Sequence, residues 1–391
     1  MKSSFLRTAP ASALPLLVAA ALSSCSKARK QPETSAHPEP AGALLSGASA
    51  FDLVATPSGA FLVWAPEERS FGGVLAQEFD TNAHARGSAR ALLARSDVGG
   101  QVLELAAIRG AQRTALAFFE KNWAGAKLVA AEGDANASLQ RIEIGVDGSG
   151  VHEGRGNLAL VLESKPDAFS LWSRAGEAEC VETGRRDCTA FSWWRLSDAR
   201  AEARGLPLSV PTPCREHALT LLREHKGLHY AVCSQASSGS AARENTLFTI
   251  QNSPEYARAD KLLAGCHALG LFTAADTTWL VGECNGQRRA ARVGSDNGAI
   301  EVRELSSPRL ECVNGRARLR AGPIDTLLEE PRAQLAPVLP STLAPRDSRA
   351  AWTGQALLVV SSRARRLDVT RYACQGSSLR QLETPKPAAS R

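Results

Sequence analysis

A strand–turn–strand pattern recurs along this chain, and it constrains the fold more than any other feature. In residues 214–233, an apolar run leads to a polar break at residues 226–227, after which apolar and polar residues alternate. The same design returns in residues 266–284. Alternation with a period of two, interrupted by a short polar turn, predicts a β-hairpin. The sequence therefore predicts a series of β-hairpins.

Counterparts of this turn recur along the chain, at Gly59, Gly110, Asp167, Gly227, Asp276, Gly315 and Gly354. Their spacing is close to the roughly 40–50 residues of a propeller blade and predicts a solenoid or a propeller. Bulky apolar strands follow five of the turns, in residues 116–119, 169–172, 228–232, 279–281 and 357–360. Two stacked β-sandwiches are the alternative fold, but the chain has no evident linker at its middle. We expect an all-β chain that forms a β-propeller of six or seven blades.

The first repeat is the clearest, with strands expected over residues 51–56, 60–64 and 73–79. Its sequence, GAFLVWAPEERSFGGVLAQEFD, resembles the blades of secreted bacterial β-propellers, in which an LVxW strand precedes a strand that ends in an acidic turn. The resemblance covers residues 51–91 well and the rest of the chain only in part. It implies the same propeller fold that the period predicts.

Residues 1–24 have the features of an export signal, with a positive end at Lys2 and Arg7 and a short apolar core. The segment ends in LSSC, which resembles the lipobox of bacterial lipoproteins and implies that Cys25 carries a lipid. An ordinary signal peptide with a chance cysteine is the alternative. Residues 25–50 are polar and contain three prolines, so we expect a disordered tether before a propeller at 51–384 and a frayed tail at 385–391.

Removing Lys2 and Arg7 from 46 basic residues leaves 44 against 40 acidic residues. This near balance gives no indication of a nucleic-acid partner. We expect attachment to the cell envelope through the lipid, with the outer membrane as the address, because no other segment is long and apolar enough to span a bilayer.

Eight cysteines remain after Cys25, an even number that predicts disulfides in an exported chain. They are Cys180, Cys188, Cys214, Cys233, Cys266, Cys284, Cys312 and Cys374. Pairing in chain order gives Cys180–Cys188, Cys214–Cys233 and Cys266–Cys284 and leaves Cys312 and Cys374. The pairing stays open, because eight cysteines allow about 105 combinations. Pairing across the turn at residues 226–227 places Cys233 opposite Thr220 and not Cys214. A zinc cluster is the alternative, but no CxxC spacing supports it.

No metal or cofactor is expected. The histidines at 217, 225 and 229 have no nearby aspartate, and the turns at 147–150 and 295–298 lack the spaced acids of a calcium loop. Neither a GxSxG elbow nor a phosphate-binding loop occurs. A pair of catalytic carboxylates stays possible, because a propeller brings distant segments together.

Two segments interrupt the strand pattern. Residues 198–205 (DARAEARG) have an N-cap candidate and a terminal glycine, so a short helix is expected there. Residues 322–346 contain five prolines and predict a long insertion between strands.

Basic residues gather toward the C-terminus, where residues 285–391 hold 18 Lys and Arg against 10 Asp and Glu. Arg316, Arg318 and Arg320 alternate with apolar residues and should face one way on a strand. They are either a solvated face or a patch for an anionic glycan or lipid head group.

These observations lead to a lipid-anchored envelope propeller that binds or scaffolds a protein or anionic glycan ligand without catalysis. The alternative is a propeller hydrolase acting on envelope or extracellular polysaccharide. Clustered carboxylates at the mouth of the central channel would favour the hydrolase.

Overall fold

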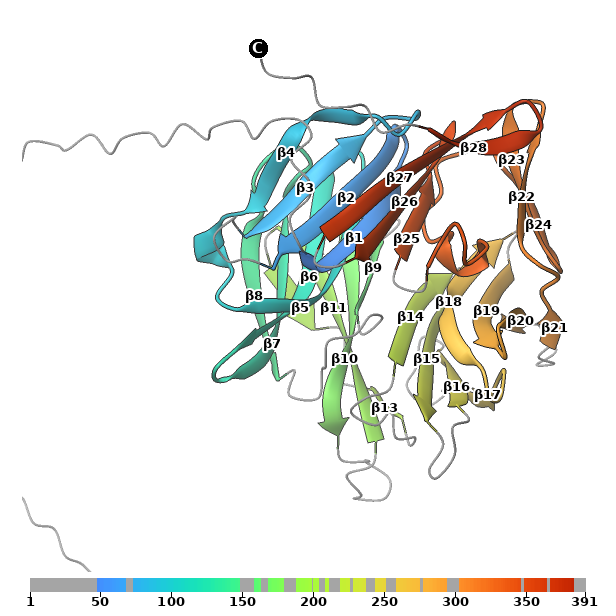
Figure 1. Ribbon diagram of the computed structural model, residues 1–391. Helices are drawn as coiled ribbons and strands as arrows, with labels where there is room; N and C mark the ends of the chain where they lie inside the picture. The colour runs from blue at the N-terminus through green and yellow to red at the C-terminus, as the bar shows by residue number, and fades with distance from the viewer. Residues whose placement is uncertain are drawn as a thin grey trace, which may run out of the picture. The chain divides into compact units, whose positions relative to one another are not determined.

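Strands of each repeat form antiparallel sheets, as the hairpin pattern predicts. The computed structural model divides into residues 1–38 and 39–391, and every residue that it describes belongs to the second unit. The described residues are 48–67, 73–147, 158–162, 168–178, 188–198, 200–203, 208–210, 219–225, 228–236, 243–250, 258–274, 277–293, 302–345, 348–363 and 366–382. Within them, strands form seven sheets, shown in chain order from blue to red in Figure 1.

The first four sheets are meanders in which neighbours in sequence pair with one another. Sheet 1 contains β1 (Ala48–Thr56), β2 (Gly59–Pro66), β3 (Val74–Phe79) and β4 (Ala85–Leu93). Sheet 2 contains β5 (Gln101–Arg109), β6 (Arg113–Asn122), β7 (Gly125–Asp134) and β8 (Gln140–Asp147). Sheet 3 contains β9 (Leu158–Leu162), β10 (Phe169–Ala178) and β11 (Cys188–Ser197), with β12 (Arg200–Ala203) and β13 (Leu208–Val210) both on β11. Sheet 4 contains β14 (Leu219–His225), β15 (Leu228–Ala236), β16 (Arg243–Ile250) and β17 (Arg258–Lys261).

The last three sheets follow the same order. Sheet 5 contains β18 (His267–Ala274), β19 (Thr277–Cys284), β20 (Gln287–Val293) and β21 (Val302–Glu304). Sheet 6 has three strands, β22 (Arg309–Val313), β23 (Arg316–Ala321) and β24 (Ile324–Leu328). Sheet 7 contains β25 (Ser348–Trp352), β26 (Ala356–Arg363), β27 (Arg366–Gln375) and β28 (Ser378–Leu382). In the described part of the chain, two single-turn 3₁₀ helices lie between sheets, η2 (Arg95–Asp97) and η4 (Ala336–Val338).

The arrangement is a propeller, because the first strand of a sheet lies against the first strands of its neighbours. Such contacts join β1 to β5, β5 to β9, β9 to β14 and β14 to β18, and β25 to β1. The expected all-β propeller fold is therefore confirmed. Four of the predicted turn positions, Gly59, Gly110, Gly315 and Gly354, lie at the junction of the first and second strands of a sheet, and the other three lie outside the described residues. The strand pattern succeeded because each hairpin is a local element whose register follows from its turn.

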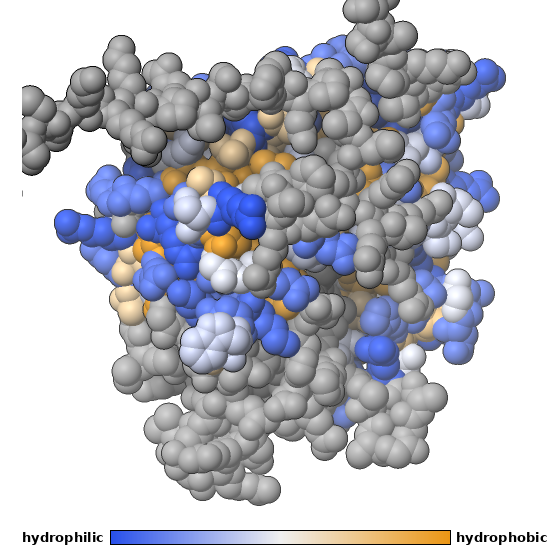
Figure 2. Space-filling view, turned by 60° about the vertical axis from the view of Figure 1, so that its left-hand side comes forward, coloured by the Kyte–Doolittle hydropathy of each residue, from blue (hydrophilic) through white to orange (hydrophobic). Residues whose placement is uncertain are grey.

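Bulky second strands fill the space between sheets, as expected. In β2, Phe61 and Val63 pack with residues of sheet 2, whereas Leu62 and Trp64 pack with residues of sheet 7. Successive side chains of a strand point to opposite faces, so one continuous apolar strand serves two interfaces. The surface in Figure 2 is mostly hydrophilic where it is described, with smaller hydrophobic areas between.

Sheet 6 departs from the pattern. Its first strand β22 lies against β28 at the far end of sheet 7, and η4 lies against β18 and β25 instead. Arg332 pairs with Trp352 through backbone hydrogen bonds, and the Leu335 amide donates to the Ala350 carbonyl at 2.9 Å. The segment 329–345 thus lies between sheets 5 and 7. The predicted insertion at 322–346 is corrected at its start, because β24 occupies residues 324–328.

A buried arginine holds this proline-rich segment in place. Arg288 of β20 is 8 % exposed. Its guanidinium donates to the carbonyls of Ala336 (3.1 Å), Pro337 (2.8 Å), Leu339 and Ala344 (3.3 Å). Carbonyls without a sheet partner are thereby satisfied, as burial requires.

The expected helix at residues 198–205 is wrong. Residues 200–203 form β12, which pairs with β11 in the register Trp194↔Ala203 and Ser197↔Arg200. Asp198 has a φ of 52° and forms the turn between them. Pairing with a neighbouring strand overrides the helix propensity of the two alanines.

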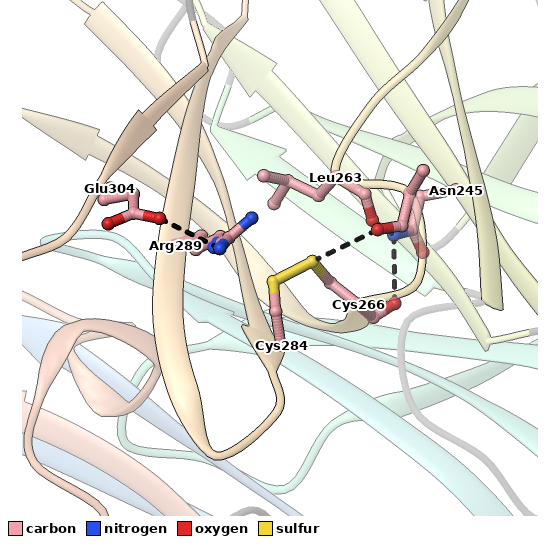
Figure 3. Close-up of a disulfide and its surroundings, with 7 residues drawn as sticks. Asn245, Leu263, Cys266, Cys284, Arg289 and Glu304 are labelled. Atoms are coloured by element: carbon pink, nitrogen blue, oxygen red, sulfur yellow. Dashed lines mark hydrogen bonds and ion pairs between the residues drawn. A yellow bond between two sulfur atoms is a disulfide. The ribbon is translucent and has the colours of Figure 1, made fainter. Parts of the chain in front are cut away.

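Two of the expected disulfides are confirmed. Cys266–Cys284 lies within sheet 5, and Cys312–Cys374 joins β22 to β27. Figure 3 shows the first of them beside Asn245, whose amide donates to the carbonyls of Leu263 (2.9 Å) and Cys266 (3.1 Å). Cys233 is also disulfide-bonded, and it lies opposite Thr220 as the sequence predicts. Cys180 and Cys214 lie outside the described residues, as does the side chain of Cys188, so their pairing stays a prediction.

Candidate functional site

Acidic side chains occur inside two apolar first strands, where they connect neighbouring sheets. Asp52 of β1 accepts a hydrogen bond through Oδ2 from the Ala107 amide of β5, at 3.0 Å. Glu104 of β5 accepts one through Oε1 from the Leu158 amide of β9, also at 3.0 Å. In each case the carboxylate of one first strand binds an amide of the next.

A basic side chain from the last sheet joins this group. Arg349 of β25 places its Nε 3.5 Å from Asp52 Oδ1, which also accepts from the Leu53 amide at 2.9 Å. The side chain of Asp52 is 21 % exposed and that of Arg349 is 25 % exposed, so solvent reaches both. Glu104 is more deeply buried, at 5 %. The first strands of sheets 7, 1 and 2 therefore each carry one of these charged residues.

These three residues were not singled out from the sequence. Each of the two acids stands between apolar residues in the first strand of a repeat, in FDL and LEL. A lone carboxylate at such a position must find a partner when it is buried. That pattern could have identified both positions, but the arginine partner comes from the opposite end of the chain.

A cavity of about 650 Å³ lies elsewhere, between the first turns of sheets 6 and 7. It is lined by Gly315, Arg316, Leu328, Glu329, Gly354 and Gln355. Arg316 Nη1 binds Glu329 Oε1 at 2.7 Å on its wall.

The expected arginine stripe is found on one face of β23, but all three of its members have acidic partners. Arg318 binds Asp325 through two hydrogen bonds of 2.7 and 2.9 Å. Arg320 lies 3.6 Å from both Glu311 and Asp325. Hydrogen bonding to Arg318 holds the pKa of Asp325 below its usual value. The three arginines are therefore balanced by nearby acids, although residues 285–391 as a whole hold more basic than acidic residues. The anionic-ligand patch at Arg316, Arg318 and Arg320 stays a prediction.

Among the described residues, no three His, Cys, Asp or Glu side chains are grouped so as to hold a metal ion. The same residues contain no helix long and apolar enough to cross a bilayer. Cys25, the predicted lipidation site, lies outside them.

No protein-family model matches the chain, and no curated protein matches its sequence. Solved structures do resemble it. One is a GH43 β-xylosidase/α-arabinofuranosidase from a compost metagenome, CoXyl43, with 11 % identity over 68 % of this chain and 96 % of that one, at a TM-score of 0.39. A GH43_1 enzyme from Xanthomonas citri has 15 % identity over 67 % and 93 %, also at 0.39. Bacillus subtilis levansucrase has 9 % identity over 69 % and 88 %, at 0.37. Scores this low transfer no residue role to this chain.

The expected non-catalytic binding or scaffolding role is corrected by this comparison. The solved structures that resemble the chain are named as β-xylosidases, an arabinanase and other carbohydrate-active enzymes.

Proposed function

We propose that this chain is a polysaccharide hydrolase whose two carboxylates are Asp52 and Glu104. We further propose that Cys25 carries a lipid that holds the enzyme at the cell envelope, with the outer membrane as its address. The substrate is a glycan, and neither a nucleic acid nor a cofactor takes part.

The observation that carries the proposal is the position of two carboxylates on adjacent first strands. Glycoside hydrolysis needs one carboxyl group as an acid and a second as a base or nucleophile. Asp52 binds the Ala107 amide, and Glu104 precedes Ala107 by three residues on β5. At about 3.3 Å per residue the two positions are roughly 10 Å apart along the strand.

We propose an inverting mechanism, because this backbone separation is closer to the carboxyl spacing of inverting enzymes than to that of retaining enzymes. Inverting enzymes hold their carboxyl groups about 6.5–9.5 Å apart, which leaves space for a water, and retaining enzymes about 5–5.5 Å apart. Arg349 contributes a fixed positive charge next to Asp52, and it orients that carboxylate through Oδ1. In this arrangement, one carboxyl group protonates the glycosidic oxygen while the other removes a proton from the attacking water.

The test uses the unlipidated mature chain, Cys25→Ser, with arabinan, xylan and an envelope polysaccharide as substrates, and measures the release of reducing ends. Asp52→Asn and Glu104→Gln should each lower kcat about 10²–10⁴-fold, the usual contribution of a general acid or base. Glu143→Gln is the control, since its side chain is 62 % exposed on β8. Thermal unfolding shows whether each variant is folded.

Two results would reject the hydrolase. One is an absence of released sugar from every polysaccharide by the folded parent. The other is activity of the two variants equal to that of Glu143→Gln, which would leave both carboxylates with a structural role in holding the first strands together.

A further inference from the structure

Among the residues that the structure describes, one aromatic side chain, that of Trp123, is almost wholly exposed. Trp123 is 99 % exposed, whereas Trp64, Trp172, Trp194 and Trp352 are buried. It lies at the tip of the β6–β7 hairpin, where the ends of the two strands pair as Asn122↔Gly125. Tryptophan is enriched at protein and membrane interfaces because its ring is apolar and its N–H is polar, so a fully exposed tryptophan is a candidate contact residue.

The hairpin is shaped to present this side chain. Asn122 Oδ1 accepts a hydrogen bond from the Ala124 amide at 2.8 Å and closes the turn around residue 123. Gly125 has a φ of 132°, a conformation that only glycine adopts readily. The turn is therefore ordered by its own residues, and Trp123 points away from the sheet without help from a neighbour.

The face of the propeller that carries Trp123 follows from the topology. Gln101, the first residue of β5, pairs with Lys121 next to the hairpin tip, so the tip lies at the face where β5 begins. Only a short connection separates the end of β4 from the start of β5, and in a four-stranded meander the last strand ends at the face where the first one began. β1 therefore also begins at this face, and the chain enters the domain there at Ala48.

That entry point matters because the residues before it are the predicted tether. Cys25 precedes Ala48 by the length of this tether, and a flexible coil of about 23 residues has an end-to-end distance of roughly 25–30 Å. A lipid on Cys25 would therefore keep the propeller within reach of a bilayer, and a contact on the domain itself would decide which face meets the lipid. Stable attachment of a lipidated protein commonly takes two signals, and a contact made by the folded domain can serve as one of them.

The chemistry of the tip fits a lipid surface. Indole rings accumulate at the level of lipid head groups because one edge is polar and the body apolar. Lys121 is exposed beside it and has no acidic partner among the described residues, so its charge is available to an anionic head group.

We propose that Trp123, assisted by Lys121, inserts into the membrane interface. The face of the propeller at which β1 and β5 begin would then lie on the bilayer. This inference rests on the lipid anchor proposed for Cys25 and is independent of the proposed hydrolysis.

The experiment measures co-sedimentation of the unlipidated mature chain, Cys25→Ser, with vesicles of phosphatidylethanolamine and phosphatidylglycerol at 3:1. Trp123→Ala should weaken partitioning about tenfold or more, the effect of losing one buried aromatic side chain. Trp123→Phe should restore part of it, and Lys121→Gln should reduce the dependence on phosphatidylglycerol. Val313→Ala is the control, because Val313 is another exposed apolar residue, 42 % exposed, but lies at the first turn of sheet 6.

A second readout locates the contact. A polarity-sensitive dye on Trp123→Cys should shift to the blue with vesicles, and the same dye at Val313→Cys should not. Binding of Trp123→Ala equal to that of the parent, or no vesicle binding by the parent, would overturn the proposal. The proposal would also fail if Trp123→Ala bound vesicles as the parent does but bound a polysaccharide more weakly, because Trp123 would then be a glycan-binding residue. None of these readouts uses hydrolytic activity, so the docking and the hydrolase fail separately.

Discussion

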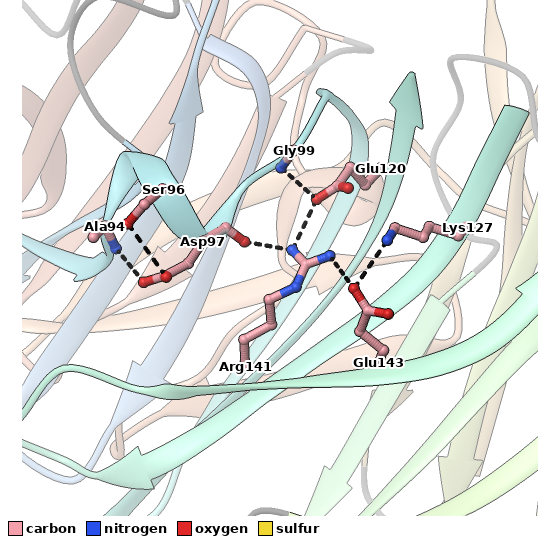
Figure 4. Close-up of polar contacts among 8 residues, drawn as sticks. All are labelled: Ala94, Ser96, Asp97, Gly99, Glu120, Lys127, Arg141 and Glu143. Atoms are coloured by element: carbon pink, nitrogen blue, oxygen red, sulfur yellow. Dashed lines mark hydrogen bonds and ion pairs between the residues drawn. The ribbon is translucent and has the colours of Figure 1, made fainter. Parts of the chain in front are cut away.

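Charged side chains inside the apolar sheets connect one blade to the segments around it. Glu120 of β6 is 1 % exposed, and its Oε2 accepts hydrogen bonds from Arg141 Nη1 at 2.9 Å and the Gly99 amide at 3.0 Å (Figure 4). Burial lowers the pKa of Arg141, but hydrogen bonds to Glu120 and Glu143 outweigh this effect and raise it. The guanidinium also donates to the Asp97 carbonyl, so η2 is tied to sheet 2.

Glu120→Gln tests this connection. Glu120 is the buried one of the two acidic partners of Arg141, and its loss should cost roughly 3 kcal/mol in the free energy of unfolding. Glu143→Gln removes a second carboxylate from the same arginine, but at an exposed position, so it should cost under about 1 kcal/mol. Urea unfolding of both variants measures the difference. Equal losses would show that Glu120 adds nothing beyond a surface pair.

At the scale of elements, the segment 329–345 lies between sheets 5 and 7 and contains η4 but no strand. It makes few backbone hydrogen bonds to strands. Two arginine side chains hold it, Arg288 of β20 and its own Arg332. Arg332 lies over the Phe272 ring at 5.2 Å and donates to the Thr273 carbonyl. The segment approaches β18 so closely that a Cβ at Gly270 would lie 2.5 Å from Pro337 Cγ.

Gly270→Ala should therefore be destabilising, by about 1–3 kcal/mol, the usual cost of overpacking a filled interior. Gly133→Ala is the matched control in β7, because its nearest neighbours lie at 3.4 Å, an ordinary contact. Alanine there should be neutral or should stabilise the strand by up to about 1 kcal/mol. Thermal unfolding compares the two, and an unaffected Gly270→Ala would mean that Pro337 moves aside freely.

The sequence predicts some elements well and others poorly, for a physical reason. Hairpins were predicted because turn chemistry and a period of two are encoded within each hairpin itself. The strand at 200–203 was missed because its partner β11, and not its own composition, decides its conformation. The path of 329–345 was missed because the arginine that holds it, Arg288, belongs to a different sheet. The contact between Asp52 and Arg349 forms because sheet 7 lies against sheet 1, and no local sequence pattern predicts which sheets meet.

At the scale of the whole molecule, the first and last sheets close on each other. Phe51 and Leu53 pack in one cluster with Leu358 and Val360. The Thr353 hydroxyl donates to the Thr81 carbonyl at 2.7 Å, and the Gln355 amide donates to the same oxygen at 3.0 Å. Sheet 6 is attached differently, through the disulfide from β22 to β27.

The two disulfides should differ in their contributions. Cys312–Cys374 spans a sequence separation of 62 and Cys266–Cys284 one of 18. Because the entropy removed from the unfolded chain grows with loop length, replacing the first pair with serines should cost about 4 kcal/mol and the second about 3 kcal/mol. Denaturant unfolding under non-reducing conditions measures both. A larger loss from the shorter loop would point to native-state packing instead of chain entropy.

The entry of the chain at Ala48 has a mechanical consequence. A pull on the N-terminal segment is transmitted along the axis of β1, the strand that lies against β2, β5 and β25. Its registered pairs with β2, from Ala48↔Pro66 to Thr56↔Gly59, are loaded together in shear and cannot open one after another like a zipper. Tension that enters the domain at Ala48 would thus be shared among sheets 1, 2 and 7, the three sheets that β1 contacts.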